Sequence, residues 1–273
     1  MKAQKSKTKN EKRDGKRDEQ QMKIKTTINQ RYARYKAFAD SMPQEFEQGG
    51  TVIYRGHNLI KTFIAPDGMV LNVKRFRRPL WANLLVYSTG LRKPKGQRAM
   101  EYANLLRKRG IGTPDVIALV EERNAIGLLG FSYLITVQVD YPHELYEMGD
   151  AKKGQYEELG AAVGHLAATL HKREVLHKDF TPGNILWKRD ADGFHFMLVD
   201  INRMAFGPVS KEKGLTSICR LWGPKDFIRI IATEYAKERG YDVEEAVSYV
   251  MEKRAKFWKR YGRKHQIKFK LEL

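Results

Sequence analysis

An eight-residue loop, HKDFTPGN at 177–184, constrains the fold of this chain more than any other stretch. It follows a strong amphipathic helix pattern over 155–171 and leads into a strand pattern. The loop carries a carboxylate, Asp179, and a carboxamide, Asn184, and a second carboxylate, Asp200, ends the apolar run FMLVD. Magnesium-dependent phosphoryl transfer uses such a set, in which one carboxylate orients a hydroxyl while an amide and a carboxylate hold Mg²⁺. The pattern therefore predicts a strand hairpin with phosphoryl-transfer residues at both of its ends.

Outside this loop, the chain shows strand patterns first and helix patterns last. Residues 51–78 read as three antiparallel strands with a turn at Pro66-Asp67-Gly68. The run RAMEYANLLRKRG at 98–110 has one apolar face and ends at a glycine, as helices commonly do. The stretch 80–96 has no clear pattern. The remaining predicted elements are a short helix over 31–46, two strands over 116–139, a hinge at 138–142, strands over 185–187 and 194–200, and helices over 227–239 and 243–261.

Length and composition set the broad class of the protein. The chain has 273 residues, of which 42% are hydrophobic, so it can fill the core of one two-lobed domain or two small ones. Its single cysteine, Cys219, excludes an internal disulfide and a cysteine-based metal site. No apolar region of the signal-peptide type follows Met1, and the longest apolar stretch, 125–139, is too short to cross a bilayer. We therefore expect a cytoplasmic protein, soluble or held peripherally at a membrane.

The formal net charge of +19 predicts an anionic partner. Nucleic acid, anionic lipid and a phosphorylated substrate all meet that description, and the charge alone does not choose among them. The first 25 residues or so are mostly Lys, Arg, Glu, Gln and Ser, which is typical of a flexible basic arm. Such an arm either binds an acidic surface or only aids solubility.

The loop at 177–184 resembles the catalytic loop HRDLKPEN of protein kinases, position by position. In this resemblance Asp179 matches the catalytic Asp, Asn184 the magnesium-binding Asn, and Asp200 the metal-binding Asp of the DFG motif. Upstream, Lys74 in NVKRF matches the strand-three Lys of VAIK, and Glu101 matches the Glu of the following helix. Five roles in the right order, each on the expected element, form a strong joint signal.

Several departures from the protein-kinase pattern limit which kinase family the chain resembles. There is no GxGxxG loop, DINR at 200–203 replaces DFG, no APE motif follows, and Thr181 replaces the usual Lys. A small kinase with these features and a basic surface resembles the lipopolysaccharide kinase (Kdo/WaaP) family, from about Thr51 to Arg203. The resemblance implies ATP-dependent phosphorylation of a sugar hydroxyl, on Kdo or heptose, in the lipopolysaccharide inner core. It also implies a site of action at the cytoplasmic membrane face, with an anionic membrane surface as a partner.

The resemblance implies an α+β, two-lobed protein-kinase-like fold. We expect a basic arm and a short helix over 1–45. A small antiparallel-sheet N-lobe with one helix then spans 46–137. A mainly helical C-lobe with a basic tail spans 138–273.

The site roles implied by the resemblance are as follows. Asp179 accepts or orients the proton of the sugar hydroxyl, while Asn184 and Asp200 bind Mg²⁺. Lys74 neutralises the phosphates of ATP and is held by Glu101. Each residue also has an alternative role without catalysis. These are a turn-capping Asp179, a turn role for Asn184, a strand-end cap for Asp200, an edge-strand lysine for Lys74 and a solvated helix face for Glu101.

Other residues near the motifs have two possible roles. Gly56, in RGHN, lets backbone N–H groups approach phosphate or is an ordinary hairpin glycine. Arg203 contacts a phosphate or an acidic sugar, or forms a structural ion pair. Glu121 and Glu122 are alternatives to Glu101 as the partner of the lysine. His177 supports the loop by hydrogen bonding, whereas the other histidines considered lack metal-ligand spacing (His57, His165 and His171).

Two further hypotheses compete with the sugar kinase. One is a different kinase on the same fold, either an atypical protein kinase of the RIO type or a small-molecule phosphotransferase, whose basic charge would serve RNA contact. The other is a pseudokinase that only binds. The intact set of Lys74, Asp179, Asn184 and Asp200 argues against the second. Nucleic acid is therefore an alternative partner rather than the expected one, and the sequence leaves the oligomeric state open.

Overall fold

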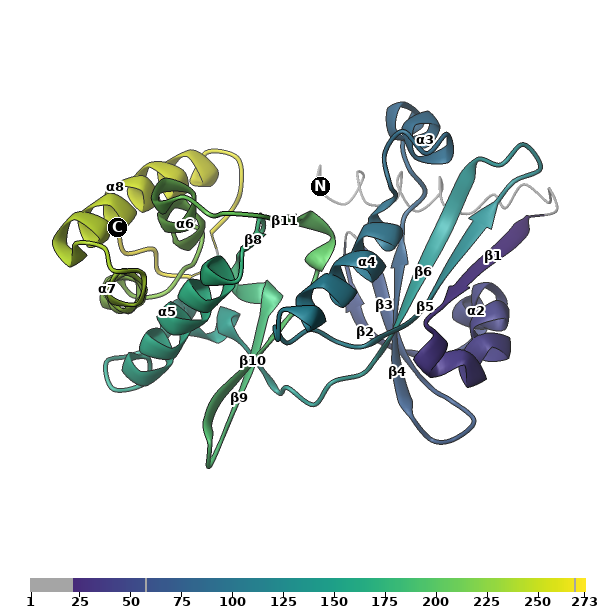
Figure 1. The fold of residues 1–273 in the computed structure, drawn as a ribbon, viewed down its shortest axis with the longest axis horizontal. Helices are drawn as coiled ribbons and strands as arrows, with labels where there is room; N and C mark the ends of the chain where they lie inside the picture. The colour runs from purple at the N-terminus through teal and green to yellow at the C-terminus, as the bar shows by residue number, and fades with distance from the viewer. Residues whose placement is uncertain (1–21, 57, 268) are drawn as a thin grey trace, which may run out of the picture. The chain divides into compact units, whose positions relative to one another are not determined.

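The chain folds into a sheet-rich unit and a helical unit, which are described separately (Figure 1). The computed structural model describes residues 22–56, 58–267 and 269–273. Unit 1 comprises the described residues up to Gly96 together with Ile117–Thr136. Unit 2 comprises Gln97–Val116 and Val137–Leu273. The α+β class predicted from the sequence is confirmed, whereas the residue boundaries predicted for the arm and the two lobes stay a prediction.

Unit 1 is built on a six-stranded sheet in the order β1-β5-β6-β4-β3-β2. The predicted strands over 51–78 and 116–139 are confirmed. In the middle of the sheet, alternate residues of β4 such as Leu71 and Val73 are fully buried, as a half-buried strand requires. The strands are β1 (Lys23–Ile28), β2 (Thr51–Arg55), β3 (Leu59–Ile64), β4 (Val70–Phe76), β5 (Val116–Arg123) and β6 (Leu129–Val137).

The turn between β3 and β4 forms as predicted from Pro66-Asp67-Gly68. Gly68 has a φ of 83°, in the left-handed region that favours glycine, and its N–H donates to the Ala65 carbonyl at 2.9 Å. The Asp67 side chain accepts from the Met69 N–H at 3.2 Å. This turn sets the register of β3 against β4, which places Ile60 opposite Lys74.

The end of the predicted basic arm, at about Lys25, overlaps a strand. Lys23–Ile28 forms β1, an edge strand that pairs antiparallel with β5. An edge strand bonds on one side only and tolerates lysines, so its sequence resembles a solvated arm. The rest of the predicted arm, residues 1–21, lies outside the described residues.

Helices cover the sheet of unit 1 and connect its strands. The predicted helix over 31–46 is present as a 3₁₀ segment, η1 (Gln30–Tyr35), followed by α2 (Lys36–Gln48). Met42 and Phe46 of α2 are fully buried. A further helix, α3 (Trp81–Ser88), forms in the stretch to which the sequence assigned no element, and Figure 1 shows it standing apart from the sheet.

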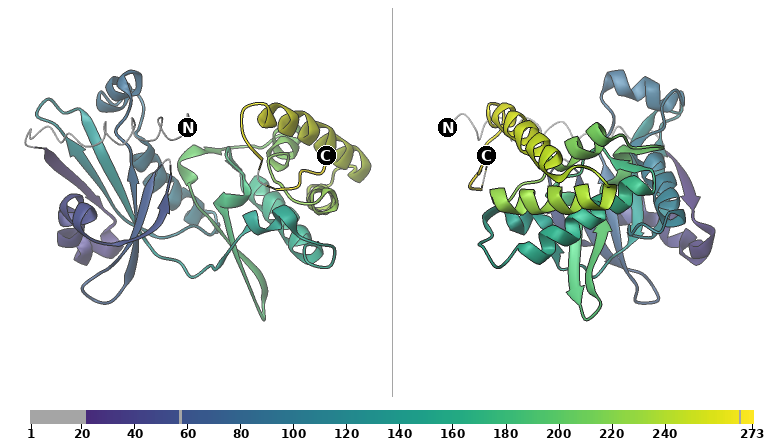
Figure 2. Two further views of the ribbon diagram at one scale, coloured as in Figure 1. Left: turned by 180° about the vertical axis from the view of Figure 1, so that it is seen from behind. Right: turned by 60° about the vertical axis from the view of Figure 1, so that its left-hand side comes forward.

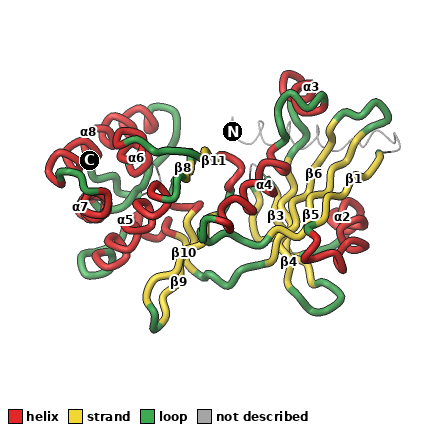
Figure 3. Tube along the Cα trace, in the orientation of Figure 1, coloured by secondary structure: helices red, strands yellow, loops and turns green. Residues whose placement is uncertain are grey.

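Unit 2 begins within α4 (Lys95–Lys108), whose buried face is the predicted one: Ala99, Ala103 and Leu106. Gly110, which follows α4, has a φ of 65° and donates its N–H to the Arg107 carbonyl at 2.9 Å, so the predicted glycine stop is confirmed. The other helices of unit 2 gather into one bundle, visible in Figures 2 and 3. They are α5 (Glu157–Lys172), α6 (Lys211–Ile218), α7 (Lys225–Arg239) and α8 (Val243–Gly262).

Small residues allow close packing of α5 against α7. A Cβ added at Gly164 would lie 2.8 Å from the Ile231 carbonyl oxygen, and one at Gly160 would lie 3.1 Å from the Phe227 ring. Phe227 and Ile231 are fully buried in this contact. The glycines therefore let two helix backbones approach, which fixes the helix that leads into the loop at 177–184.

Short strands hold that loop and the Asp200 segment side by side. β8 (Val175–His177) pairs antiparallel with β11 (Met204–Phe206), and His177 lies opposite Met204. β9 (Ile185–Asp190) and β10 (Gly193–Leu198) form the predicted hairpin. The loop therefore runs from β8 to β9, and Asp200 lies between β10 and β11. Unit 2 also contains β7 (His143–Glu144) and three 3₁₀ segments, η2 (Leu145–Asp150), η3 (Pro182–Asn184) and η4 (Ile201–Arg203).

Candidate active site

The loop from β8 to β9 is held in one conformation by its own backbone and by two buried side chains. The Thr181 N–H donates to the Asp179 carbonyl at 2.8 Å, and the Asn184 N–H donates to the Thr181 carbonyl at 2.9 Å. Phe180 and Pro182 are buried beneath the loop. The loop therefore presents its polar side chains from a fixed backbone, which a precise active site requires.

His177 joins the loop to the Asp200 segment. Its Nδ1 accepts from the Asp179 N–H at 3.1 Å, so the ring proton lies on Nε2, which donates to the Val199 carbonyl at 3.2 Å. The ring is 1% exposed, and burial lowers the pKa of His177, so the neutral form is favoured. The supporting role predicted for His177 is confirmed.

Asp179 lies between two arginines. Its Oδ2 forms an ion pair with Arg203 Nη1 at 2.8 Å, and its Oδ1 accepts a hydrogen bond from Arg220 Nη1 at 3.2 Å. Arg220 Nη1 also donates to the Lys178 carbonyl at 2.7 Å, so it holds both the backbone and the carboxylate of the loop. Arg203 therefore forms an ion pair, one of the two roles considered for it.

Sequence reasoning missed Arg220. It lies just after α6, in a segment without a motif, and it is one of 51 Lys and Arg residues in the chain. No local pattern could single it out, because its link to Asp179 depends on how α6 packs. Only the tertiary fold reveals it.

Asn184 has its amide oriented by two acceptors. Its Nδ2 donates to the Asp179 carbonyl at 2.9 Å and to Thr181 Oγ1 at 3.2 Å. With the NH₂ group directed into the loop, Oδ1 is the amide atom suited to bind a cation.

Asp200 has an unusual backbone conformation at the end of β10. Its φ and ψ are 52° and 43°, a left-handed conformation that costs a residue other than glycine about 1–2 kcal/mol. Its Oδ1 accepts from Asn202 Nδ2 at 2.5 Å. Just before it, the Val199 N–H donates to the Asn184 carbonyl at 3.0 Å, which links the Asp200 segment directly to the loop. Strain of this kind is often found at functional positions.

The donor set of this loop and segment fits a magnesium ion. Among the described residues, no group of three or more His, Cys, Asp and Glu could hold a metal ion. Mg²⁺ does not need one, because it keeps several waters and is bound by one or two carboxylates together with substrate phosphates. An amide oxygen from Asn184 and a carboxylate from Asp200 are hard oxygen donors of that kind.

Lys74 and Glu101 belong to different units. Lys74 is half-buried on β4, and its Nζ lies 5.4 Å from the centre of the Phe76 ring. Glu101 is exposed on α4 in unit 2. Their predicted pairing therefore stays a prediction. The alternatives have partners within unit 1: Glu122 accepts from the Tyr133 hydroxyl at 3.0 Å, and Glu121 pairs with Arg123 at 3.4 Å.

Gly56 lies in the turn between β2 and β3. Its N–H donates to the Asn58 carbonyl at 3.0 Å, and its carbonyl accepts from Arg77 Nη2 at 3.1 Å. A Cβ at this position would lie 2.5 Å from the Tyr54 hydroxyl oxygen. These contacts place Gly56 in a tight hairpin, but the exposed Tyr54 side chain can move, so they do not require a glycine there. Its predicted approach to phosphate stays a prediction.

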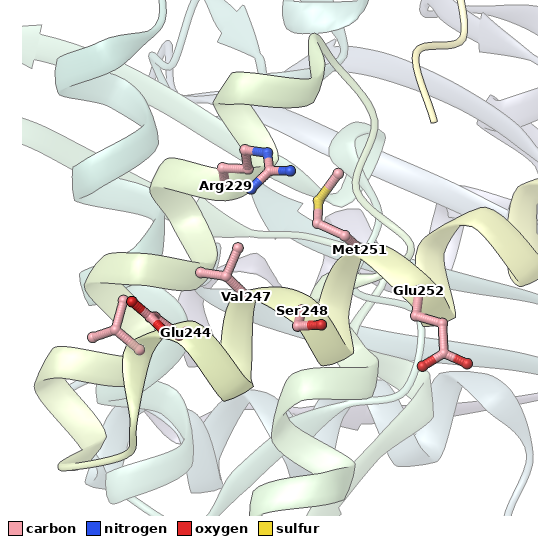
Figure 4. A pocket seen from close by; sticks show the side chains of 7 residues that line it. Arg229, Glu244, Val247, Ser248, Met251 and Glu252 are labelled. Atoms are coloured by element: carbon pink, nitrogen blue, oxygen red, sulfur yellow. The ribbon is translucent and has the colours of Figure 1, made fainter.

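A pocket of about 580 Å³ lies elsewhere in unit 2 (Figure 4). It is open, and none of the candidate site residues lines it. The candidate site residues of unit 2 therefore belong to a different part of the unit. The pocket is lined by α8 and by one arginine of α7: Arg229, Val243, Glu244, Val247, Ser248, Met251 and Glu252.

Comparisons with known proteins identify the family. The model of the lipopolysaccharide kinase (Kdo/WaaP) family matches residues 68–213, just over half of the chain. The matched range includes Lys74, Glu101 and the loop and segment that carry Asp179, Asn184 and Asp200, but not Gly56. No curated protein matches the sequence.

Solved structures give the fold. A structure of WaaP in complex with acyl carrier protein has 16% identity and a TM-score of 0.54, covering 86% of this chain and 99% of that chain. Amicoumacin kinase hAmiN in complex with AMP-PNP, Ca²⁺ and Ami has 10% identity and a TM-score of 0.49, covering 83% and 88%. The Rio2 kinase of Chaetomium thermophilum, in an ADP/Mg²⁺-phosphoaspartate complex, has 14% identity and a TM-score of 0.44, covering 77% and 65%.

No helix in the described part of the chain combines the length and the apolar character that a membrane span needs. The fold is protein-kinase-like, as expected from the motifs, and the WaaP structure covers most of it. By its motifs, its fold and the match of the family model, this chain is a kinase and belongs to the lipopolysaccharide kinase (Kdo/WaaP) family.

Proposed function

We propose that this protein transfers a phosphoryl group from Mg-ATP to a sugar hydroxyl, on Kdo or heptose, of the lipopolysaccharide inner core. One observation carries the proposal. Asp179, Asn184 and Asp200 belong to one hydrogen-bonded assembly, joined by the Val199–Asn184 backbone bond and by the ring of His177. Kinase chemistry depends mainly on positioning and electrostatic stabilisation, and this assembly is built for positioning.

Each residue of the assembly has a distinct proposed role. Asp179 accepts a hydrogen bond from the acceptor hydroxyl and orients it toward the phosphoryl group. Asn184, through Oδ1, and Asp200, through its carboxylate, hold Mg²⁺, which neutralises phosphate charge when bound. From unit 1, Lys74 binds nucleotide phosphates, with Glu101 as its predicted partner and the Gly56 turn covering the phosphates.

The two arginines beside Asp179 suit an anionic acceptor. The Arg203 and Arg220 side chains are partly exposed while each contacts the carboxylate, so each can also face a ligand. Guanidinium groups bind carboxylate and phosphate in a bidentate way. Kdo carries a carboxylate, and a phosphorylated core carries phosphate, so either acceptor complements this pair.

The net charge of +19 supports an anionic membrane surface as the second partner. The lipid-linked acceptor lies at such a surface, so we place the protein at the cytoplasmic side of the inner membrane, held peripherally. Each basic residue near an anionic leaflet contributes on the order of 1 kcal/mol to attachment.

The proposal is tested by incubating purified protein with Mg-ATP and one of three acceptors: deacylated inner-core lipopolysaccharide, a generic basic protein, or none. We expect transfer to the sugar alone. Asp179→Ala should abolish it, whereas Asp192→Ala, which removes an exposed aspartate from the β9–β10 turn, should leave it unchanged. Transfer to the protein alone would instead assign the chain the RIO-type activity.

A further inference from the structure

The segment around α3 has an unusual charge distribution. Residues 68–100 contain eight Lys and Arg and no Asp or Glu. Four of these cations are exposed and lie in two pairs, Arg77-Arg78 before α3 and Arg92-Lys93 after it. The segment is therefore a local concentration of positive charge within a chain that carries 32 acidic residues elsewhere.

Three leucines of the same segment face solvent. Leu80 is 79% exposed, Leu85 is 62% exposed and Leu91 is 83% exposed. Scattered exposed leucines are common and need no explanation. Here, however, they lie before, on and after one short helix, and two of them adjoin the cation pairs, in the orders RRPL and LRK.

Two residues at the C-terminal end of α3 anchor the helix to unit 1. Tyr87 is buried, and Ser88 Oγ accepts from the Leu129 N–H at the start of β6, at 3.0 Å. An eight-residue helix is marginal in water alone, so this anchor is needed to keep it folded. The exposed leucines take no part in the anchor, and the packing of unit 1 does not explain them. Figures 1 and 2 show that α3 does not lie over the face of the sheet, although Ser88 attaches it to β6.

Leucines between pairs of cations match the chemistry of an anionic bilayer surface. Interfacial segments bury apolar side chains at the boundary of headgroups and acyl chains, while Lys and Arg contact the lipid phosphates. A protein partner would have to supply both an apolar surface and an acidic rim. An anionic bilayer presents both over its whole area, so charge complementarity favours the lipid.

We propose that residues 77–93, centred on α3, form a membrane-binding surface of this protein. Leu80, Leu85 and Leu91 enter the interfacial region of an anionic bilayer, and the two cation pairs contact its phosphates. The inference adds a defined surface to the membrane partner proposed above. Its tests use vesicles without a sugar acceptor, so its failure is distinguishable from a failure of the proposed phosphoryl transfer.

A fluorophore attached at the surface reports insertion directly. Cys219 is buried, and burial raises the pKa of its thiol to about 12, so a thiol introduced at the surface is labelled selectively. The full chain with Leu85→Cys is labelled with an environment-sensitive dye and mixed with vesicles. The vesicles are phosphatidylcholine alone or phosphatidylcholine with phosphatidylglycerol. We expect a blue shift only with the anionic vesicles.

The matched control is Ile64→Cys. Ile64 is 75% exposed, but it lies at the end of β3 beside the β3–β4 turn. The other end of β3, at Leu59, pairs with Arg75 and is the end near α3. A dye at this position should show no shift. Equal shifts at both positions, or none at Leu85→Cys, would overturn the proposal. A blue shift at Leu85→Cys that appears without lipid and grows with protein concentration would also overturn the proposal. It would show that this surface is an interface between two copies of the chain.

A charge-preserving variant separates insertion from general electrostatic attraction. The triple substitution Leu80→Asn, Leu85→Asn and Leu91→Asn keeps the net charge, and circular dichroism checks its folding. In high salt, where charge attraction is screened, we expect its partition onto anionic vesicles to fall by about tenfold or more relative to the original chain. An unchanged partition in high salt would mean that the leucines do not insert.

Discussion

At the scale of single residues, the arrangement around Asp179 is the most informative feature of this kinase. Motif reasoning finds the carboxylate and Arg203 but not Arg220, because Arg220 reaches the loop only through the packing of α6. The carboxylate has a defined orientation since each of its oxygens pairs with a different guanidinium. We therefore regard Arg220 as a positioning residue.

Arg220→Gln tests this role. The variant loses the bonds to the Lys178 carbonyl and to Asp179, so the loop should become less well oriented. We expect kcat to fall by roughly 10- to 100-fold with little change in the KM for ATP. Steady-state kinetics with the sugar acceptor measure both constants.

The control for this variant is Arg229→Gln, which changes an exposed arginine at the α7–α8 pocket. It should leave both constants unchanged. A wild-type kcat for Arg220→Gln would show that Asp179 does not depend on that arginine.

A buried histidine in the helix bundle makes stability depend on pH. Burial lowers the pKa of His171 to about 4, and its Nδ1 accepts from the Tyr235 hydroxyl at 2.9 Å. Since the folded-state pKa lies below the unfolded value near 6.5, the neutral ring contributes stability above pH 6.5. That contribution is lost as the pH falls from about 6.5 toward 4.

Urea unfolding at pH 7 and pH 5 measures this effect. His171 should account for roughly 2 kcal/mol of the stability lost between the two pH values. His171→Asn does not titrate and can still offer an acceptor to Tyr235, so it should remove that part of the pH dependence. The same pH dependence in the variant would assign the loss to other groups.

At the scale of elements, most helices and strands follow from periodicity, and two of the failures have a clear physical cause. β1 resembles a solvated arm because an edge strand needs only one partner. α6 was not predicted because Gly214 interrupts its helical pattern. That glycine is required by packing, since a Cβ there would lie 2.0 Å from the Tyr235 hydroxyl oxygen.

The packing of α5 on α7 gives a prediction at this scale. A methyl group at Gly164 meets the backbone of α7 at Ile231, which cannot move without shifting the helix. We expect Gly164→Ala to lower the free energy of unfolding by about 1–3 kcal/mol. Thermal and urea unfolding measure the change.

The same substitution at Gly183 is the control, because a Cβ there has nothing within 4 Å. Gly183→Ala should change stability by less than about 0.5 kcal/mol. Equal effects of the two substitutions would mean that close packing of α5 and α7 does not stabilise the bundle.

At the scale of the whole molecule, the candidate residues are divided between the two units. Asp179, Asn184 and Asp200 lie together in unit 2, and the sequence predicted their proximity because they flank one hairpin. Lys74 lies in unit 1. Its proposed role rests on its place in β4 and on its match to the kinase motif.

Lys74→Met tests the contribution of unit 1. The variant removes the charge proposed to bind nucleotide phosphates and keeps most of the side-chain volume. We expect the kcat/KM for ATP to fall by about 100-fold or more, while the free energy of unfolding stays unchanged. Lys61→Met is a poor control because Lys61 donates to two backbone carbonyls, whereas Lys108→Met removes an exposed lysine and should have no effect. Undiminished ATP use by Lys74→Met would assign phosphate binding to another cation.

The most direct test of the central claim compares ATP binding with single-turnover transfer for two isosteric variants, Asp179→Asn and Asp200→Asn. If Asp179 orients the acceptor and Asp200 holds Mg²⁺, Asp179→Asn should bind Mg-ATP normally and transfer phosphate to the sugar at least about 100-fold more slowly. Asp200→Asn should lose Mg²⁺-dependent binding of ATP. Transfer by Asp179→Asn at the rate of the original chain would contradict the account.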